Sequence, residues 1–451
     1  MVGAFPMPPL LPQAMSTVDP KLLADLQQRN LVAQMSGGDE LATHLSGGSR
    51  TVYAGFDPSA NSLHIGSLVP LLALRRFQLA GHKPIALVGG ATGLIGDPSF
   101  KAKERALIDE AIVADWVECL KQQISVYIDF DSGANNAAIM ANNLDWTRDM
   151  KVLTFLRDVG KHFAVNNMIN KESVKQRIER EGEGISYTEF TYLILQSFDF
   201  AELYKRYNCT LQIGGSDQWG NITGGVDLTR RLHGGTVYGL TLPLVTKADG
   251  TKFGKTETGT IWLDPMRTSP YAFYQFWLNS ADADVYNFLR YFTFLDIQQL
   301  RDIEAADKTS GKKPEAQGIL AKEATQLVHG ESGLAAAQRI TEALFANSLR
   351  NLSAEDLAQL KLDGLPSTTL SPAELVDKPL TQLLSEAGVV TSGKQVKDAL
   401  SSQSVFINEQ ALSMQDNMLT AEHFSPAKAL HEKYFVLKLG KKKYHLFDLQ
   451  F

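Results

Sequence analysis

Cysteine is scarce in this sequence: among 451 residues there are two, Cys119 and Cys209. Two cysteines far apart cannot build the disulfide framework that staples small secreted domains. They form no CxxC pair and give no zinc site, so we predict no metal site in the protein. The scarcity indicates a reducing compartment, and we expect the protein to be cytoplasmic.

Long hydrophobic runs and an excess of positive charge are missing as well. No stretch approaches the ~18 apolar residues that a membrane-spanning helix needs, so we expect no membrane partner. The 44 Lys and Arg residues are outnumbered by 50 Asp and Glu residues, which gives a net charge of −6. A nucleic-acid partner would therefore need a local basic patch, because the protein as a whole provides no attraction.

The first residues lack basic side chains altogether. The segment "MVGAFPMPPLLPQAMSTVDP" is apolar and proline-rich, and no Lys or Arg occurs through Pro20. A secretory signal begins with positive charge and a transit peptide is rich in arginine, so this segment resembles neither. We predict that residues 1–18 form a disordered N-terminal extension.

Beyond that extension the sequence alternates between helix-like and strand-like segments. Residues 20–46 have leucines at helical spacing, and residues 50–56 are rich in strand-forming side chains. Residues 68–81 are apolar at helical spacing, and residues 83–90 form a short apolar run. Strand, helix, strand is the βαβ unit of a parallel sheet, so we predict an α/β fold. Ligands of such sheets bind at the carboxyl ends of the strands.

The length is too great for one ordinary core, so we predict several domains. An α/β domain is expected over residues 19–265 and a helical domain over residues 266–361. A stretch rich in Pro, Ser and Asp over residues 362–379 is typical of a linker. The remaining residues, 380–451, are predicted to form a small α+β domain.

Four glycine-bearing loops are candidates for a nucleotide site. They are "GFDPSANSLHIGS" (55–67), "GGATGLIGDPS" (89–99), "IGGSDQWGN" (213–221) and "KFGKT" (252–256). Glycine permits close backbone approach, and helix N-termini bind anions. Lys252 and Lys255 provide two ammonium groups, which suit a polyphosphate whose charge grows during reaction. None of the loops matches the Walker pattern or the dinucleotide fingerprint GxGxxG after the first strand.

The pattern of these loops resembles a known family. "HIGS" resembles the HIGH signature of the class I aminoacyl-tRNA synthetases, and "KFGKT" resembles their KMSKS signature. Longer blocks are similar to the bacterial-type tyrosyl-tRNA synthetases within that family, and the match runs from about residue 20 to the end. These blocks are "YAGFDPSANSLHIG", "LVGGATGLIGDPS", "LQSFDF" and "LQIGGSDQWGNIT".

The resemblance implies a fold and a reaction. It implies a Rossmann-like catalytic domain, a helical anticodon-side domain and an S4-like RNA-binding domain at the C-terminus. The family activates L-tyrosine with ATP to give tyrosyl-adenylate and pyrophosphate, then transfers tyrosine to the 3′ end of tRNA(Tyr). ATP is a substrate that arrives with Mg²⁺, and no tightly bound cofactor is expected. The family is homodimeric.

The resemblance also assigns roles to residues at matching motif positions. Contacts to the phosphates and pyrophosphate are assigned to Ser59, His64, Lys101, Arg105, Lys252, Lys255 and Thr256. Contacts to tyrosine are assigned to Tyr53, Asp97, Tyr192, Gln196, Asp199 and Gln218. The nucleotide cleft is assigned to Gly55, Asp57, Gly66, Ser67, Gly215, Asp217 and Lys255.

Tyr53 and Asp199 match the pair that hydrogen-bonds the substrate phenol. A site that demands a hydroxyl partner rejects phenylalanine by about 10⁴–10⁵, a figure established for tyrosyl-tRNA synthetase itself. Ser67 departs from the family, whose members commonly carry a second histidine there. A serine donates and accepts hydrogen bonds but cannot carry charge, so the role of this position is left open.

The predicted C-terminal domain holds the basic patch that an RNA partner would need. Six lysines between residues 428 and 443 face a single acid, Glu432. RNA contacts are predicted at Lys428, Lys441, Lys442 and Lys443. Clustered lysines neutralise phosphates and release counterions, which favours nucleic-acid binding. The same lysines could instead serve solubility alone.

Alternatives stay open at this point. His64 alone could be a loop or capping histidine, Lys252 and Lys255 a solvated turn, Asp97 a turn cap and Tyr192 a core aromatic. The chain could be another HIGH-type enzyme, such as a tryptophan enzyme or a small-molecule adenylyltransferase. It could also be an RNA-binding protein on an inactive synthetase scaffold, for which motif decay would be the sign. Ser67 is the one candidate for such decay.

Overall fold

The computed structural model describes residues 18–98, 107–179, 184–251, 253–256, 259–311, 314–346, 348–440 and 443–450. The described residues form two compact units. The first unit contains the chain up to Leu263 together with Ser280–Leu320, and the second contains Asp264–Asn279 together with the chain from Ala321 onward. No helix of the described ranges is long and apolar enough to cross a membrane.

A six-stranded sheet forms the centre of the first unit, with strand order β1-β6-β5-β2-β3-β4. The strands are β1 (Gln34–Met35), β2 (Thr51–Phe56), β3 (Lys83–Val88), β4 (Ile139–Asn142), β5 (Cys209–Gly215) and β6 (Tyr238–Leu242). All pairs are parallel except β1 with β6. β3 and β6 are almost entirely buried, as expected for strands covered on both faces.

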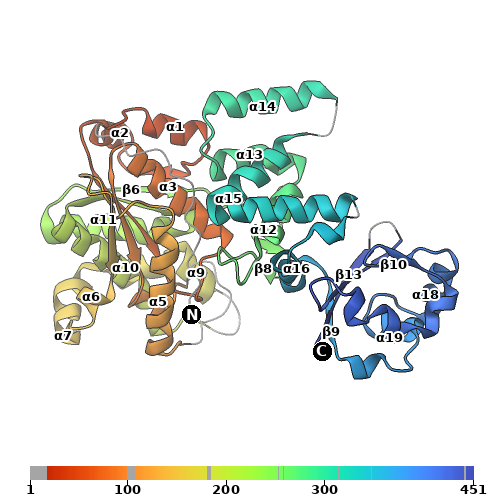
Figure 1. Cartoon of the computed structure of the whole chain (residues 1–451). Helices are drawn as coiled ribbons and strands as arrows, with labels where there is room; N and C mark the ends of the chain where they lie inside the picture. The colour runs from red at the N-terminus through yellow and green to blue at the C-terminus, as the bar shows by residue number, and fades with distance from the viewer. Residues whose placement is uncertain are drawn as a thin grey trace. The chain divides into compact units, whose positions relative to one another are not determined.

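Helices pack on both sides of this sheet (Figure 1). The longest are α3 (Leu68–Leu79), α5 (Glu110–Ser125), α10 (Tyr187–Tyr207) and α11 (Trp219–His233). α3 packs on β2, β3 and β5, while α10 and α11 pack on each other and on β5. Ser186 caps α10 by accepting a hydrogen bond from the N–H of Glu189 (3.2 Å), and Asn208 ends it with φ 50°. These helices fix the loops that follow β2 and β5.

The strand order creates a crevice at one edge of the sheet. β3 and β4 lie on one side of β2, whereas β5 and β6 lie on the other. The connections that leave the carboxyl ends of β2 and β5 therefore run in opposite directions. Such a topological switch point is where open α/β sheets bind their ligands.

The N-terminal helix predicted over residues 20–46 is interrupted. The structure has α1 (Leu22–Gln28), then β1, then α2 (Asp39–Ser46). Asn30, Gly37 and Gly38 have φ of 58°, 77° and 46°. A helix cannot continue through left-handed backbone, so the leucine spacing is shared by two short helices.

Two further helices of the first unit follow the four glycine-bearing loops in sequence. They are α13 (Asp282–Phe292) and α14 (Ile297–Ser310). The guanidinium of Arg29, in the residue after α1, donates to the carbonyl of Leu295 (2.8 Å). Asp296 and Gln299 form a capping box at the start of α14. Phe288 and Phe292 of α13 are buried.

The second unit combines helices with a mixed five-stranded sheet of order β11-β10-β12-β13-β9. The strands are β9 (Ser367–Leu370), β10 (Val405–Ile407), β11 (Gln410–Leu412), β12 (Tyr434–Leu439) and β13 (Lys443–Leu449). The helices include α12 (Pro270–Leu278), α15 (Ala316–Ala346, of which Ala321 onward belongs here), α16 (Ala354–Gln359), α17 (Leu380–Glu386) and α18 (Gly393–Ser401). The sheet is antiparallel except for β9, which pairs with β13 in parallel.

Residues 362–379, predicted as a linker, differ from that expectation. They contain β9 and the short helix η7 (Pro372–Leu375), and Leu370 and Leu375 are buried in the core of the unit. Ser371 and Glu374 form a capping box at the start of η7. The predicted domain boundaries also differ from the two units, because α13 and α14 belong to the first unit and α12 to the second.

Candidate active site

Two adjoining cavities open at the carboxyl edge of the first unit's sheet. One has a volume of about 350 Å³ and the other of about 200 Å³. Both are lined by Gly55, Phe56 and Asp57 at the end of β2, and by Gly215 at the end of β5. The shared wall lies at the switch point of the sheet. Two ligands, or two parts of one ligand, would therefore meet beside Asp57.

The smaller cavity is lined by every residue that the resemblance assigns to tyrosine binding. These residues are Tyr53, Asp97, Tyr192, Gln196, Asp199 and Gln218. Tyr192, Gln196 and Asp199 share one face of α10, since residues three and four apart on a helix are neighbours. Tyr53 is fully buried in β2, and its hydroxyl has no hydrogen-bond partner among the described residues.

Asp199 is the buried acid of the smaller cavity. Its carboxylate accepts hydrogen bonds from Asn143 Nδ2 (3.0 Å) and Trp146 Nε1 (2.8 Å). Burial raises the pKa of Asp199 to about 7, although both hydrogen bonds work in the opposite direction. Burial also raises the pKa of Tyr53 well above its usual value, and the charge of Asp199 raises it further. The cavity therefore holds the neutral phenol of Tyr53 beside a carboxyl group whose pKa is close to neutral pH.

Side-chain amides at the smaller cavity are joined in a chain of hydrogen bonds. Gln218 Nε2 donates to Asp97 Oδ2 (2.8 Å). Asn221 Nδ2 donates to the amide oxygens of Gln196 (2.9 Å) and Gln218 (3.1 Å). The network joins α10 and α11 to the loop that contains Asp97. An amine that entered here would meet one carboxylate and several amide oxygens.

Asp57 connects the two cavities. It accepts hydrogen bonds from the hydroxyls of Tyr192 (2.7 Å) and Thr92 (2.6 Å). The backbone of Gly89 lies so close to Asp57 and Thr92 that a Cβ at this position would collide with both side chains. The close approach explains a glycine in "LVGGATG".

The larger cavity is lined by all the residues assigned to the nucleotide cleft except Lys255, and by two of those assigned to the phosphates. Among them are Ser59, His64, Gly66, Ser67 and Asp217. The Nδ1 atom of His64 accepts a hydrogen bond from the N–H of Gly66 (3.0 Å). A neutral ring with Nδ1 as acceptor carries its proton on Nε2, which leaves that atom as a donor. Loss of hydration lowers the pKa of His64, and the positive charge of Lys255 lowers it further.

The segments "LHIGS" and "KFGKT" are connected by backbone hydrogen bonds. The N–H of Ile65 donates to Ile261 O (2.9 Å), and the N–H of Leu263 donates to Leu63 O (2.9 Å). The N–H of Ile261 in turn donates to Gly254 O (3.0 Å). Gly254 has φ 75°, and a Cβ there would collide with the side chain of Ile65.

Lys255 and its loop stand at the rim of this region. Lys255 lies in β7 (Lys255–Thr256), is exposed, and is not among the residues that line either cavity. Phe253 lines the larger cavity and packs its ring near those of Phe288 (5.1 Å) and Phe292 (5.3 Å) of α13. The structure therefore brings the loop to the mouth of the larger cavity.

Several predicted residues fall outside the described part of the chain. They are Lys101, Arg105, Lys252, Lys441, Lys442 and the side chain of Thr256, as well as residues 1–17 of the predicted extension. Lys428 and Lys443 are described and belong to the second unit, in the short helix η9 (Pro426–Lys428) and at the start of β13. The described residues include no group of three His, Cys, Asp or Glu side chains that could hold a metal ion.

Sequence reasoning missed several residues of the smaller cavity. Thr92, Asn143 and Gln212 line it, and Trp146 and Asn221 hydrogen-bond residues that do. Thr92, Gln212 and Asn221 lie inside the blocks "LVGGATGLIGDPS" and "LQIGGSDQWGNIT". Their place in those blocks was the available signal. Asn143 and Trp146 lie outside every block, and no pattern marks them.

Two family models match the chain. The model described as tRNA synthetases class I (W and Y) matches residues 46–346. The model described as Tyrosine--tRNA ligase SYY-like C-terminal domain matches residues 356–447.

The chain is similar along nearly its whole length to curated proteins. It is 58% identical to the tyrosine--tRNA ligase of Aliivibrio fischeri (strain MJ11) over 431 residues, which cover 96% of this chain and 99% of that protein. It is 56% identical to the tyrosine--tRNA ligase of Serratia proteamaculans (strain 568) over 430 residues, which cover 95% of this chain and 99% of that protein.

Solved structures share its fold. A C-terminally truncated Aspergillus nidulans mitochondrial tyrosyl-tRNA synthetase is 30% identical, with a TM-score of 0.63 and coverage of 72% of this chain and 94% of that one. A tyrosyl-tRNA synthetase from Archaeoglobus fulgidus, complexed with L-tyrosine, is 14% identical with a TM-score of 0.51, and the match covers 69% of this chain and 99% of that one. At that identity the likeness concerns the fold alone.

Proposed function

Because this chain belongs to the class I tRNA synthetases of the tryptophan and tyrosine type, and among them to the tyrosine–tRNA ligases, we propose that its two adjoining cavities bind tyrosine and ATP side by side. Its activity is tyrosine–tRNA ligation. Its fold is the Rossmann-like α/β fold of that family, followed by helices and a C-terminal mixed sheet. Relatives at 58% identity do not favour the alternatives of another HIGH-type enzyme or an inactive scaffold.

The Tyr53 hydroxyl beside Asp199, unpartnered among the described residues, is the observation that carries the assignment of the smaller cavity. The phenol of a bound tyrosine would donate to the Asp199 carboxylate and accept from the Tyr53 hydroxyl. Phenylalanine would leave both buried groups without that partner, which is costly. At the other end, the α-ammonium group would meet Asp97, Tyr192 and Gln196.

The substrate carboxylate would then lie beside Gln218 and the shared wall. In the first step its oxygen attacks the α-phosphorus of ATP, a new C–O–P bond forms, and the bond to pyrophosphate breaks. No covalent enzyme group is needed; alignment and charge stabilisation suffice. The Nε2–H of His64 would donate to a phosphate oxygen, and Asp217 would accept from the ribose.

The lysine loop would neutralise the leaving pyrophosphate. We assign this to Lys252, Lys255 and Thr256, with Ser59 as a hydroxyl donor, and to Lys101 and Arg105, which follow Asp97 in the sequence. ATP would enter with Mg²⁺ held by its own phosphate oxygens, as is usual for this ion. Gly55, Gly66, Ser67 and Gly215 would line the nucleotide.

In the second step a ribose hydroxyl at the 3′ end of tRNA(Tyr) attacks the tyrosyl carbonyl carbon, an ester forms and AMP leaves. We assign tRNA contacts to the C-terminal domain over residues 380–451, through Lys428, Lys441, Lys442 and Lys443. The exposed ammonium group of Lys443 supports this assignment, and counterion release would make the affinity salt-dependent.

A homodimer is part of this proposal. Five large apolar side chains are exposed on the segment from α7 (Val152–Thr154) to α8 (Val165–Ile169): Val152 (71%), Leu153 (81%), Leu156 (47%), Val165 (58%) and Ile169 (40%). We call these side chains the apolar patch, and exposed apolar side chains of this kind are typical of an interface. We also place the enzyme in the cytoplasm, on the basis of its two cysteines.

Substrate binding by Tyr53→Phe tests the assignment of the smaller cavity. Affinities of tyrosine and phenylalanine for the wild type and the variant would be measured by calorimetric titration. We expect the preference for tyrosine to fall by about tenfold or more, since one hydroxyl hydrogen bond in a buried site is lost. An unchanged preference would show that the phenol binds elsewhere.

A further inference from the structure

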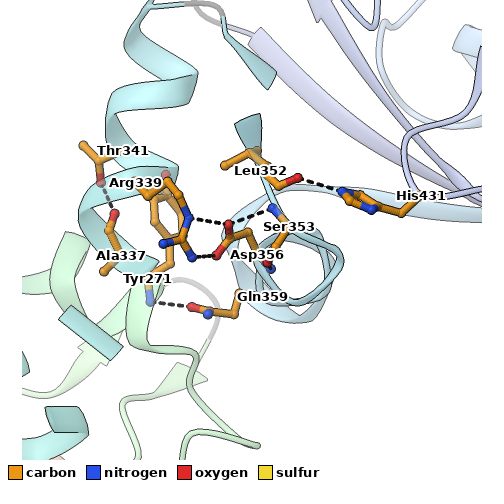
Figure 2. Close-up of polar contacts among 9 residues, drawn as sticks. All are labelled: Tyr271, Ala337, Arg339, Thr341, Leu352, Ser353, Asp356, Gln359 and His431. Atoms are coloured by element: carbon orange, nitrogen blue, oxygen red, sulfur yellow. Dashed lines mark hydrogen bonds and ion pairs between the residues drawn. The ribbon is translucent and has the colours of Figure 1, made fainter. Parts of the chain in front are cut away.

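A short segment in the second unit connects its helices to its sheet. We define the α16 joint as residues 353–364, which contain α16 and the following turn η6 (Leu360–Gly364). Arg339 of α15 donates from Nε and Nη2 to the two carboxylate oxygens of Asp356, at 2.7 Å each (Figure 2). Asp356 is fully buried, and its carboxylate also accepts from the N–H of Ser353 (2.9 Å). This carboxylate therefore fixes the start of α16 and its orientation on α15 together.

The same joint caps α12 from outside that helix. The N–H of Tyr271, in the first turn of α12, donates to Gln359 Oε1 (3.1 Å), as Figure 2 also shows. The N–H and hydroxyl of Ser269 donate to the two carboxylate oxygens of Asp363 (2.8 and 2.6 Å). The first N–H groups of a helix have no acceptor within it, so these contacts supply hydrogen-bond acceptors at the start of α12.

On its other side the joint shares a core with the sheet. Ile340 of α15 and Leu357 and Leu360 of the joint belong to one buried cluster with Tyr434, Val436 and Leu446 of β12 and β13. Two polar contacts accompany this cluster. The ring Nε2 of His431 hydrogen-bonds the carbonyl of Leu352 (2.7 Å; Figure 2). The Tyr444 hydroxyl donates to the carbonyl of Leu344 (2.8 Å).

We propose that the α16 joint is a rigid connection that sets the position of the RNA-binding domain relative to α12 and α15, and that the Arg339–Asp356 pair is its positioning contact. The proposal rests on the proposed function of that domain in tRNA binding. A bidentate guanidinium–carboxylate pair fixes orientation as well as distance, and Lys would not replace it fully. Removing Arg339 leaves a buried carboxylate with one partner fewer, which favours other arrangements of the joint.

The consequence concerns tRNA and not tyrosine activation. If the domain holds the orientation that binds tRNA for only a fraction of the time, the apparent affinity falls by that fraction. Tyrosine and ATP bind in the first unit, to residues that do not belong to the joint. Arg339 is therefore a positioning residue, and its loss would separate the two steps of the reaction.

The test uses the full-length protein and three variants. Arg339→Ala and Asp356→Asn weaken the pair from either side, and Arg339→Lys keeps the charge. Lys121→Ala serves as a control, because it breaks an exposed ion pair to Glu118 on α5 (2.7 Å). For each protein we would measure tyrosine-dependent ATP–pyrophosphate exchange, KM for tRNA(Tyr) in charging, and hydrogen exchange of residues 353–364.

We expect Arg339→Ala and Asp356→Asn to raise KM for tRNA about fivefold, to leave pyrophosphate exchange unchanged, and to speed hydrogen exchange in the joint. For Arg339→Lys, both KM for tRNA and the rate of hydrogen exchange should lie between those of these two variants and those of the wild type. Faster hydrogen exchange with unchanged KM for tRNA would overturn the proposal. The proposal would also be overturned if Arg339→Ala raised KM for tRNA and Asp356→Asn did not, because Arg339 would then contact RNA directly. Absence of exchange activity in the wild type would instead contradict the proposed function.

Discussion

At the scale of single residues, Asp199 links burial to substrate choice. Its pKa is raised from 3.8 to about 7 because the carboxyl group is buried. The folded state thus binds the proton more tightly than the unfolded chain does. The stability that this proton contributes is fully present below about pH 4 and is lost as the pH rises through about 7. We expect tyrosine binding to depend on pH in the opposite sense, since in the proposed site the phenol would donate to the ionised form.

We therefore predict that kcat/KM for tyrosine in pyrophosphate exchange rises with pH, with a midpoint near the pKa of about 7. Asn143→Ala should move the midpoint upward, because the hydrogen bond from Asn143 favours the carboxylate. Rates measured across this range for both proteins would check the prediction. A wild-type rate that does not change with pH would contradict it.

The signature residues give a second prediction at this scale. Lys255→Ala should lower the exchange rate by about 10²-fold or more, because one charge that stabilises the leaving pyrophosphate is lost. Ser67→His should change the rate by no more than about tenfold, or ~1.4 kcal/mol, since a hydroxyl already reaches the cavity wall there. Steady-state exchange kinetics would compare both with the wild type. A small effect of Lys255→Ala would refute the role given to this loop.

The sequence predicted site residues within one segment better than contacts between segments that lie far apart along the chain. Tyr192, Gln196 and Asp199 were predicted from the resemblance, and their helical spacing agrees because it places them on one face. Asn143 and Trp146 were not, because they approach Asp199 only after β4 and α6 (Leu144–Thr147) fold against α10. A hydrogen bond between segments so far apart leaves no trace in local spacing.

At the scale of elements, the contact between "LHIGS" and "KFGKT" depends on a left-handed glycine. Gly254→Ala should reduce pyrophosphate exchange by about tenfold while tyrosine binding persists, because the new Cβ meets Ile65 and displaces the loop. Gly250→Ala is the matched control: its φ of 78° is similar to the 75° of Gly254, and a Cβ there meets nothing within 4 Å. Equal losses in both variants would mean that backbone strain, and not the contact with Ile65, is responsible.

The elements that sequence patterns predicted well are buried strands and long helices. β2 begins within one residue of the predicted segment at 50, and α3 begins at the predicted residue 68, since burial on both faces or on one stripe leaves a regular pattern. β9 was missed because "STTL" is short and lies among Pro and Ser. Its pairing with β13 spans many residues, and local composition does not record such pairing.

At the scale of the whole molecule, the exposed apolar patch on α7–α8 predicts an assembly. Leu153→Asp should convert a dimer into a monomer in sedimentation velocity, because a charge would be buried without a partner. Met418→Asp is the control, since Met418 is also exposed (64%) but lies in the second unit. A wild type that sediments as a monomer, or a Leu153→Asp protein that remains dimeric, would exclude this patch as the interface.

The central claim is that the chain activates tyrosine and then charges tRNA(Tyr). The most direct measurement is ATP–pyrophosphate exchange by the full-length protein with each amino acid in turn, with tyrosine, phenylalanine and tryptophan compared at equal concentration. The account predicts exchange with tyrosine, and exchange with phenylalanine weaker by about 10⁴-fold or more, the range established for this enzyme family. Exchange that depends on tryptophan and not on tyrosine, or no exchange with any amino acid, would contradict it.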